Sequence, residues 1–448
     1  MLDGTRPWPF DCTASVQSVY SSPTRRMPAV VSGVLKHLLT CTIPQISAAP
    51  PGTQACTLDI EKFHRTVPIS PHHKCWIVVQ GKGGEFYIDH CSPFGCRSAC
   101  SNAGMVANAG LDICQAHKLG PALKYEDDIK FFRTPSAQGR IVEGDFRYDY
   151  DGSDVKALLG GLLGFPLHPE KGDGIFRSHS DFIGFHWDIE VKAVSLPEKK
   201  RLKFLRRVTD LSAELARSSN LCTRKPIEKI HGSLWHVAFV HTEGRSYLPA
   251  FSNLMSDFDR RSPYVRLHAT TGVVQSLGWW AGTLGSEGKI RSLHSRGLAV
   301  DYHLFVDAST DFGIGVLIGE EWAMLRLKEG WKVQGKDICW LETVAIEVLF
   351  LLLDERGWRD RHLIIHSDNQ GTIGAVANGR SRNPHINLSV RRLYELAICT
   401  GLSPSLRYVE TSQNPADPLS RGIAGPPTQK IETDIRLPPD LAQALFFA

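Results

Sequence analysis

Hydrophobic and polar residues alternate in several short stretches of the first half of the chain. Residues 76–79 and 85–88 flank a glycine-rich turn, a pattern typical of two antiparallel strands joined in a hairpin. A second hairpin is predicted over residues 123–132, with acidic residues at its turn. Between the two hairpins, seven of the twelve residues 99–110 are Ala, Gly or Ser, so a helix here can approach a neighbouring segment closely.

Leucine and valine recur at helical spacing after residue 198, and strand-like runs follow in the last third of the chain. One apolar stripe predicts an amphipathic helix and consists of Leu202, Leu205, Val208, Leu211 and Leu215. A stretch rich in Gly, Ser and Arg, residues 282–297, predicts a linker. After it we predict strands at 303–307, 313–318 and 322–327, a helix at 341–354, a strand at 362–367, further helices, and a strand near 406–409. This order predicts an α/β domain.

Length and composition narrow the class of protein. At about 150 residues per domain, 448 residues suggest about three domains. A content of 42% hydrophobic and 22% charged residues excludes a disordered or membrane-embedded chain. The longest apolar run, 344–353, is interrupted by Glu347 and is too short to span a bilayer, so we expect no membrane partner. Eleven cysteines without a C-x-x-C pair argue against a zinc module and indicate an intracellular protein, in the cytoplasm, the nucleus or both.

Positive charge is concentrated in one segment. The formal net charge of the whole chain is +4, but residues 198–229 hold ten basic and four acidic residues. This segment therefore carries +6, as expected where a protein surface meets phosphate groups. A solvated helix face is the alternative interpretation of the same charges.

A first group of carboxylates surrounds the turn of the second hairpin. Asp127 and Asp128 are adjacent in this turn, where aspartate is also common for ordinary structural reasons. Asp59, however, ends an earlier apolar strand, and a Pro-Phe-Gly turn leads into the small-residue helix between them. Three carboxylates from two strand segments can hold two magnesium ions about 3.5 to 4 Å apart, which activate a hydroxyl and stabilise a leaving pyrophosphate.

A second group of carboxylates lies in the predicted α/β domain. Asp307 and Asp368 end two strands, Glu342 lies on the first helix, and Asp417 begins the last helix. If the two strands are neighbours, these acids face one crevice and can hold two metal ions that direct water at a phosphodiester. Each aspartate taken singly is also typical of a turn or cap, and Glu347 competes with Glu342 as the helix acid.

Taken in order, these motifs resemble reverse transcriptases, most closely those of fungal DIRS-like (tyrosine-recombinase type) retroelements, over about residues 51–422. Residues 125–128 resemble the Y-x-D-D box, and 58–65 resemble the first aspartate motif. The second group resembles the ribonuclease H domains of retroelements, which favours Glu342 over Glu347. The resemblance implies Mg²⁺, two ions per active site, with Mn²⁺ as an alternative. It also implies an RNA template, a DNA primer, RNA–DNA hybrid and deoxynucleoside triphosphates as partners.

The resemblance assigns roles to further residues. His64 falls at about the position of the ribose-discriminating aromatic residue of the family, with Phe63 beside it, and Lys171 resembles the lysine that protonates pyrophosphate. Core packing for Phe63 and an ordinary surface position for Lys171 stay open as alternatives. Residues 182–185 resemble the primer grip. The motif that positions template and nucleotide corresponds to Pro93, Phe94 and Gly95.

The basic helix resembles a polymerase thumb, which follows a duplex through its phosphates. Its predicted backbone contacts are Lys199, Lys200, Lys203, Arg206 and Arg207. The predicted fold is an α+β polymerase palm with a helical thumb region, followed by an α/β ribonuclease H-like domain. The predicted domains are a poorly ordered N-terminal segment (1–52, a fingers remnant or unrelated), a palm (53–194), a thumb/connection (195–296), a ribonuclease H-like domain (297–424) and a Pro-rich tail expected to be loose (425–448).

The sequence thus predicts an RNA-directed DNA polymerase with ribonuclease H activity. The 58 residues before Asp59 do not resemble the fingers of a complete polymerase, so we expect an element copy truncated at its N-terminus. No protease, recombinase or integrase motif is visible, so mobilisation would need other element-encoded proteins. Two alternatives remain: a chain active only as a ribonuclease H, and a catalytically silent nucleic-acid-binding remnant. The presence of all seven acids favours an enzyme.

Overall fold

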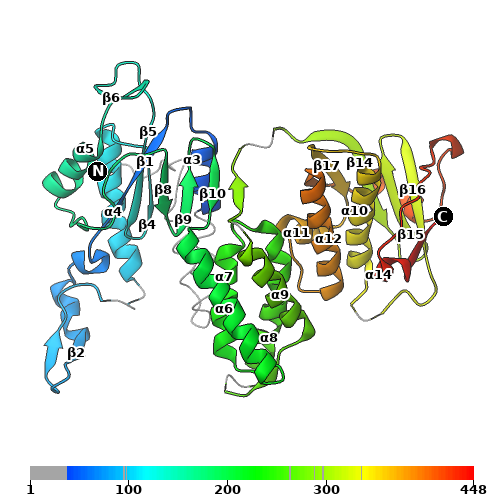
Figure 1. Ribbon diagram of the computed structural model, residues 1–448, viewed down its shortest axis with the longest axis horizontal. Coiled ribbons are helices and arrows are strands. Elements are labelled where there is room, and N and C mark those ends of the chain that lie inside the picture. Colours follow the sequence, from blue (N-terminus) through cyan, green and yellow to red (C-terminus); the bar gives the residue numbers. More distant parts are fainter. Residues whose placement is uncertain are drawn as a thin grey trace. The chain divides into compact units, whose positions relative to one another are not determined.

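The computed structural model divides into two compact units, each of which mixes helices and strands (Figure 1). The first unit comprises Met1–Phe204 and Ser286–Ser295, and the second comprises Leu205–Gly285 and Arg296–Ala448. Within the described part of the chain, no helix is both long and apolar enough to cross a membrane. The structure describes residues 38–93, 96, 98–261, 264–286, 288–294, 297–333 and 335–448.

An antiparallel sheet in the order β1-β5-β4 forms the centre of the first unit and contains the second predicted hairpin. Helix α4 packs against it through small residues, since Ala103 and Ala107 lie in the same buried cluster as Leu58. A Cβ at Gly110 would lie 2.8 Å from the Phe165 ring, which confirms the predicted close approach of this helix. These elements are β1 (Gln54–Asp59), α4 (Ala99–Ala116), β4 (Ala122–Tyr125) and β5 (Asp128–Arg133).

The second sheet of the first unit has the order β13-β10-β9-β8. Its strands are β8 (His179–Phe182), β9 (Phe185–Asp188), β10 (Ala193–Ser195) and β13 (Ile290–Ser292). Strand β13 falls inside the predicted linker 282–297, and α9 (Thr271–Gly285) also extends into it. The linker prediction is therefore wrong for these residues, because β13 gains order by pairing with β10.

Smaller elements complete the first unit. The first predicted hairpin is present as β2 and β3, although its apolar side chains are exposed. Within the segment 1–52, expected to be poorly ordered, residues 38–47 form helical turns, and Ile46 and Ala49 are buried. Residues 1–37 lie outside the described part. These elements are α3 (Ile43–Ser47), β2 (Val78–Gln80), β3 (Phe86–Ile88), β6 (Ile141–Glu143), β7 (Phe146–Tyr148) and α5 (Gly152–Lys156).

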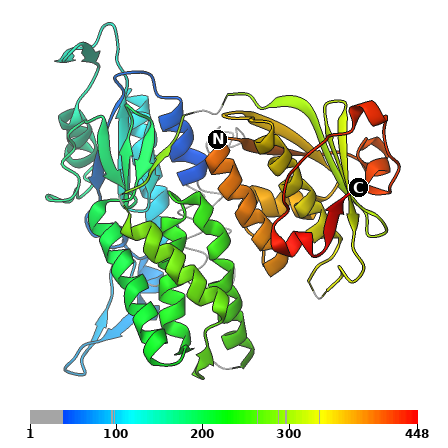
Figure 2. The ribbon, with the colours of Figure 1, turned by 45° about the vertical axis from the view of Figure 1, so that its right-hand side comes forward.

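The amphipathic helix predicted from residue 198 is α6 (Glu198–Arg217). Val208, Leu211 and Leu215 are buried as predicted, but Leu202 is 37% exposed, and the neighbouring Phe204 is buried instead. Helices α7, α8 and α9 of the second unit pack side by side (Figures 1 and 2). The helical part also contains β11 (Leu221–Cys222), α7 (Arg224–Val237), α8 (Pro249–Arg261) and β12 (Leu267–His268).

A six-stranded sheet in the order β18-β17-β14-β15-β16-β19 forms the other part of the second unit. Strands β14, β15 and β16 are antiparallel, and β17 and β18 run parallel to β14, which confirms an α/β arrangement. The sheet is covered on both faces: along β16, Ala323 and Leu325 join the cluster around α10, whereas Trp322 and Met324 pack with Leu419 of α13. The strands are β14 (Val300–Ala308), β15 (Gly313–Ile318), β16 (Glu321–Leu327), β17 (His362–Ser367), β18 (Ser403–Tyr408) and β19 (Leu445–Phe447), and the helices are α10 (Ile338–Glu355), α11 (Gln370–Asn378), α12 (Pro384–Thr400), α13 (Asp417–Ser420) and α14 (Pro439–Ala442).

Two predicted domain limits differ from the structure. The predicted thumb/connection, 195–296, is divided between the two units, since residues 195–204 and 286–295 belong to the first. Its larger part, Leu205–Gly285, lies in the same unit as the predicted ribonuclease H-like domain 297–424, and there the Asn387 side chain donates a hydrogen bond to the Ser246 carbonyl oxygen at 2.6 Å. The predicted tail 425–448 is packed rather than loose, because Ile431, Leu441 and Leu445 join the core of the six-stranded sheet.

Candidate functional site

The first carboxylate group is assembled by strand pairing in the first unit. Asp59 is the last residue of β1 and pairs with Asp128, the first residue of β5. The β4–β5 turn has two central residues, Glu126 and Asp127, and Glu126 adopts a left-handed backbone with φ of 53°. The Ile60 amide donates to the Asp127 carbonyl oxygen at 3.0 Å, which ties this turn to the end of β1. Three predicted acids therefore meet at one sheet edge.

Lys171 lies beside these acids, with its Nζ 3.7 Å from an Asp59 carboxylate oxygen. The segment before it runs along the end of β1, where the His168 amide donates to the Asp59 carbonyl oxygen at 2.8 Å. Gly172 has a φ of 73°, and a Cβ there would lie 2.6 Å from the Thr57 carbonyl oxygen. Only glycine fits this close approach without a shift, so Gly172 helps to place Lys171 near the carboxylates.

A pocket of about 300 Å³ opens at this edge, lined by Asp59, Asp128 and Lys171 on one side and by the β8–β9 turn on the other. The turn has Ile183 and Gly184 at its centre, with φ of 49° and 77°. A β-branched residue rarely adopts a positive φ, so the backbone is strained at Ile183, as often happens at binding sites. The segment predicted to resemble a primer grip thus borders the pocket.

The pocket acids have perturbed protonation. Burial, followed by repulsion from Asp127 and Asp59, raises the pKa of Asp128 to about 6. Burial and repulsion from Asp127 also raise the pKa of Asp59, whereas Lys171 lowers it. Like-charged carboxylates gathered at one edge are suited to a divalent cation, whose charge offsets their repulsion. The three side chains fit such an ion in number and chemistry.

The second carboxylate group lies at the ends of β14 and β17. These strands are parallel neighbours, so Asp307 near the end of β14 and Asp368 just after β17 share one edge of the sheet. Helix α10 adds Glu342, and one carboxylate oxygen from each of the three residues lies within 4.8 Å of the others. Among the described residues, Asp59, Asp127 and Asp128 do not form an equally close group.

The second group is deeply buried. Asp307 and Glu342 are each 3% exposed. Burial, with repulsion from Asp307 and Asp368, raises the pKa of Glu342 to about 9, and burial raises that of Asp307 to about 6. One Glu342 oxygen accepts a hydrogen bond from the Ala308 amide at 3.2 Å, but the buried Oε2 has no hydrogen-bond partner. A buried acceptor left unpaired among acids fits a cation ligand.

Neighbouring side chains hold these acids in place. The Asn414 amide donates to Asp307 Oδ1 at 3.1 Å, and the Thr411 hydroxyl donates to Asp368 Oδ2 at 2.5 Å. The fourth predicted acid, Asp417, accepts hydrogen bonds from Nε and Nη2 of Arg421 at 2.8 to 3.0 Å. The sequence analysis assigned no role to Thr411, Asn414 or Arg421, although Asn414 lies three residues before Asp417 and Arg421 lies four residues after it.

Glu347, the competing helix acid, lies elsewhere. It is 1% exposed and forms an ion pair with Arg392, whose guanidinium also contacts Asp440 of the C-terminal segment at 3.0 Å. Glu342, and not Glu347, therefore lies beside Asp307 and Asp368.

The predicted nucleotide- and template-binding residues have mixed positions. Phe63 is 5% exposed and belongs to the apolar core, which agrees with the alternative interpretation as a packing residue. His64 is 9% exposed and contacts Cys100, with 3.8 Å between Nε2 and Sγ. Pro93 is half-buried before α4. Phe94 and Gly95 lie outside the described residues.

The predicted phosphate-contacting residues of α6 do not form one uniform surface. Three of them are exposed: Lys199, Lys203 and Arg206. Two make contacts within the protein, since Lys200 Nζ donates to the Gly184 carbonyl oxygen at 3.1 Å and Arg207 donates to the Ser233 hydroxyl at 2.8 Å. Lys200 thus supports the strained turn that borders the pocket.

The buried position of Lys130 was not predicted. Lys130 of β5 is fully buried, and its Nζ donates to the Ser180 hydroxyl at 2.9 Å. The rings of Phe132, Phe182 and Trp187 lie within 5.9 Å of the same nitrogen. Burial lowers the pKa of Lys130 to about 7. Alternation along a strand gives no signal that a lysine points into the protein.

Comparison with known proteins finds similar solved structures but no matching family model and no matching curated protein. The foamy viral protease-reverse transcriptase dRH in complex with double-stranded DNA matches 82% of this chain and 59% of its own, at 11% identity and a TM-score of 0.38. The foamy viral protease-reverse transcriptase in complex with RNA/DNA hybrid matches 89% of this chain and 48% of its own, at 13% identity and a TM-score of 0.41. The foamy viral protease-reverse transcriptase in complex with double-stranded DNA matches 83% of this chain and 70% of its own length, at 13% identity and a TM-score of 0.37. This chain covers less than two thirds of the first two, and the function proposed below rests on its own two carboxylate groups.

Proposed function

We propose that the chain is an RNA-directed DNA polymerase with ribonuclease H activity. The observation that supports this most is the presence of two carboxylate groups in one chain, each at the edge of its own sheet. One group faces an open pocket lined by a lysine and a strained turn, which suits nucleotidyl transfer. The other is a close acidic cluster in an α/β sheet, which suits hydrolysis of a phosphodiester.

In the polymerase site, Asp59, Asp127 and Asp128 would hold Mg²⁺. The ion would supply positive charge for ionising the primer hydroxyl and for stabilising the leaving pyrophosphate. Lys171, whose Nζ lies 3.7 Å from Asp59, would give a proton to the leaving group, and the Ile183–Gly184 turn, which lines the same pocket, would hold the primer end. The exposed basic residues of α6 would contact backbone phosphates.

In the hydrolytic site, Asp307, Glu342, Asp368 and Asp417 would hold Mg²⁺, or Mn²⁺ in its place. Asn414 and Thr411 orient two of these carboxylates through hydrogen bonds, which fixes their oxygens before substrate arrives. Without a cation, the raised pKa of Glu342 keeps a proton on its side chain at neutral pH. Cation binding would release that proton.

The experiment that tests this proposal measures two activities of the same purified chain. Primer extension on an RNA template with deoxynucleoside triphosphates should be lost in Asp127→Asn/Asp128→Asn and kept in Asp368→Asn. Cleavage of RNA in an RNA–DNA hybrid should show the opposite pattern. Cleavage without extension in the wild-type chain would overturn the polymerase part.

A chain active only as a ribonuclease H is the second candidate. Its support is that Asp307, Glu342 and Asp368 approach one another within 4.8 Å, whereas the first group is less closely gathered. The two-assay experiment separates this candidate from the first. Membership of the DIRS-like retroelements stays a prediction from the motifs.

A further inference from the structure

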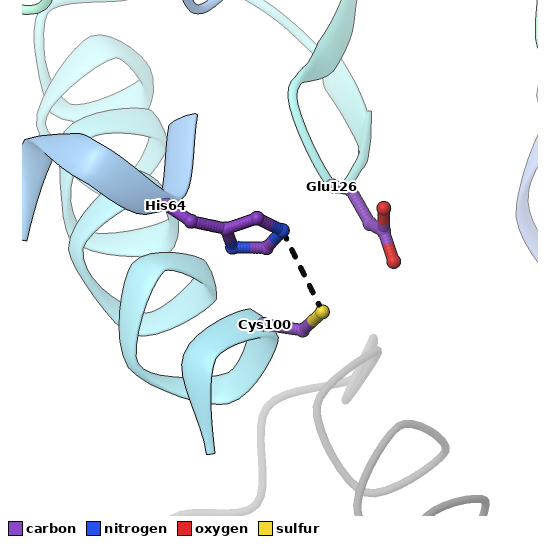
Figure 3. A group of neighbouring side chains, drawn as sticks. All are labelled: His64, Cys100 and Glu126. Carbon is purple, nitrogen blue, oxygen red and sulfur yellow. Dashed lines mark hydrogen bonds between the residues drawn. The ribbon is translucent and has the colours of Figure 1, made fainter. Parts of the chain in front are cut away.

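Three side chains with different metal-binding atoms meet next to the first carboxylate group. His64, Cys100 and Glu126 each offer one ligand atom, and these three atoms lie within 4.8 Å of one another (Figure 3). The Glu126 side chain extends from the β4–β5 turn toward the same space as the imidazole and the thiol. The cluster lies wholly within the first unit.

Each residue is positioned by a different element. His64 lies on the short helix Phe63–Thr66 that follows β1, and Cys100 is in the first turn of α4. Glu126 occupies the first central position of the β4–β5 turn, with φ of 53°. Because the turn is tied to β1 by the bond from the Ile60 amide, the cluster is built on paired strands.

The spacing suits a tetrahedral ion. With Zn–N of about 2.0 Å and Zn–S of about 2.3 Å, a tetrahedral angle separates the two ligand atoms by about 3.5 Å. The observed distance between His64 Nε2 and Cys100 Sγ is 3.8 Å. Glu126, joined to the backbone by a flexible stem, needs only a small movement to supply the third ligand, and water can supply the fourth.

We propose that His64, Cys100 and Glu126 bind a zinc-like divalent cation. A thiolate and an imidazole select soft or borderline ions over Mg²⁺, so this site is chemically distinct from the neighbouring all-carboxylate group. Binding requires a neutral imidazole and releases the thiol proton of Cys100. The spacing of cysteines along the chain cannot reveal such a site, because its ligands come from three separate elements.

The site also has a consequence for the proposed polymerase, and this part rests on the proposed function. Glu126 directly precedes Asp127, so a bound ion would tie the β4–β5 turn to α4 and to the helix after β1. Micromolar Zn²⁺ should therefore slow primer extension and leave hybrid cleavage unchanged.

The binding test uses cobalt as a spectroscopic substitute for zinc on the full chain. Titration with Co²⁺ should give a sulfur-to-cobalt charge-transfer band and the visible bands of a tetrahedral ion, and Zn²⁺ should displace both. Cys100→Ser should remove the charge-transfer band, and Glu126→Gln should weaken Zn²⁺ binding at least about tenfold. Cys75→Ser is the matched control, because Cys75 is an exposed thiol of the same unit and should leave the spectrum unchanged.

The outcomes separate this proposal from the polymerase proposal. No charge-transfer band in the wild-type chain, or a band that survives Cys100→Ser, overturns the site. A chain that never extends primers but shows the Cys100-dependent band keeps the site and removes only its consequence for polymerisation. A far-ultraviolet spectrum for each variant verifies that it is folded.

Discussion

The two carboxylate groups are built from the same chemistry but in contrasting ways. In the first unit, strand pairing and a turn place the acids beside a pocket, and Lys171 lies 3.7 Å from one of them. In the second, two parallel strand ends and a helix enclose Asp307 and Glu342, each 3% exposed. In the first group, the ammonium of Lys171 offsets part of the negative charge. In the second group, deeper burial disfavours the ionised carboxylates more strongly.

The difference shows in the pKa values. In the first group, burial and neighbouring acids raise the pKa of Asp128 to about 6. In the second, burial and two neighbouring acids raise the pKa of Glu342 to about 9. Burial without a positive partner thus has the larger effect. The second group should therefore depend more strongly on a bound cation than the first.

The largest expected effect follows from replacing Glu342. In Glu342→Gln, hybrid cleavage should fall on the order of 10²–10³-fold, because one carboxylate of the proposed metal site is lost. Primer extension should stay within about twofold of wild type, since the other unit carries that site. The measurement compares both rates at saturating Mg²⁺. Glu347→Gln does not serve as a silent control, because Glu347 pairs with Arg392 in the core.

The stability of the metal-free second unit should depend on pH. The pKa of Glu342 rises from its ordinary value of 4.5 to about 9 on folding, so the folded state loses stability as pH rises between these values. The loss should reach several kcal/mol by pH 9, because each unit of difference between the two pKa values contributes about 1.4 kcal/mol, and both Mg²⁺ and Glu342→Gln should remove it. Hydrogen exchange of α10, measured with a chelator from pH 5 to 9, reports the effect. Exchange protection that is independent of pH would contradict it.

Lys171→Ala tests the first carboxylate group, in which a positively charged side chain lies next to the acids. Primer extension should fall by about 10²-fold through loss of a proton donor. Because Lys171 lowers the pKa of Asp59, its removal should also shift the acid side of the pH–rate profile toward higher pH. Hybrid cleavage should not change. A uniform decrease at every pH would argue for a purely structural role of Lys171.

Lys130→Met tests whether the buried ammonium of Lys130 destabilises the first unit. The pKa of Lys130 falls from 10.5 to about 7 on folding, so the wild type gains stability as pH rises between these values. Lys130→Met should be more stable by about 1 kcal/mol at pH 6, and this advantage should disappear toward pH 10. Denaturant unfolding at the two pH values measures it. Destabilisation at pH 6 would show that the aromatic rings and Ser180 hold the ammonium favourably.

The smallest effect is expected for Arg421→Ala. Arg421 pairs with Asp417 near the protein surface, with 56% of its side chain exposed. Removing it frees the fourth acid, so the Mg²⁺ concentration for half-maximal hybrid cleavage should fall by no more than about fivefold. Arg359→Ala, which removes another exposed ion pair of the same unit, should leave this concentration unchanged. A rise in the Mg²⁺ requirement would assign Arg421 to substrate binding instead.

Local sequence patterns predicted those parts of both sites that depend on residues close together in the sequence. Short apolar runs located the strand ends at Asp59 and Asp307, and helical spacing located α6. Contacts between distant segments were not predictable in this way. Examples are the ion pair of Glu347 with Arg392 and the contact of His64 with Cys100. These depend on packing, which a one-dimensional pattern does not encode.

The predicted linker and tail illustrate the same limit. Residues 290–292 have a composition typical of a loop, but β10 offers them a free edge, and pairing overrides their weak local preference. Near the end of the chain, Pro-rich sequence suggested a loose segment, yet a few apolar residues are enough to bind it to the core. In both segments, tertiary contacts determine the structure more strongly than local sequence preference does.

The packed C-terminal segment has a consequence for self-association. Strand β16 has seven residues, and the C-terminal segment covers its outer edge in two places: β19 pairs with residues 325–327, and the Ile431 amide donates to the Trp322 carbonyl oxygen at 2.8 Å. An uncovered edge of that length can pair with the same edge of another molecule and begin aggregation. The three-residue β19 leaves a much shorter edge. Removing the last residues should therefore promote aggregation at high protein concentration while both carboxylate groups stay intact.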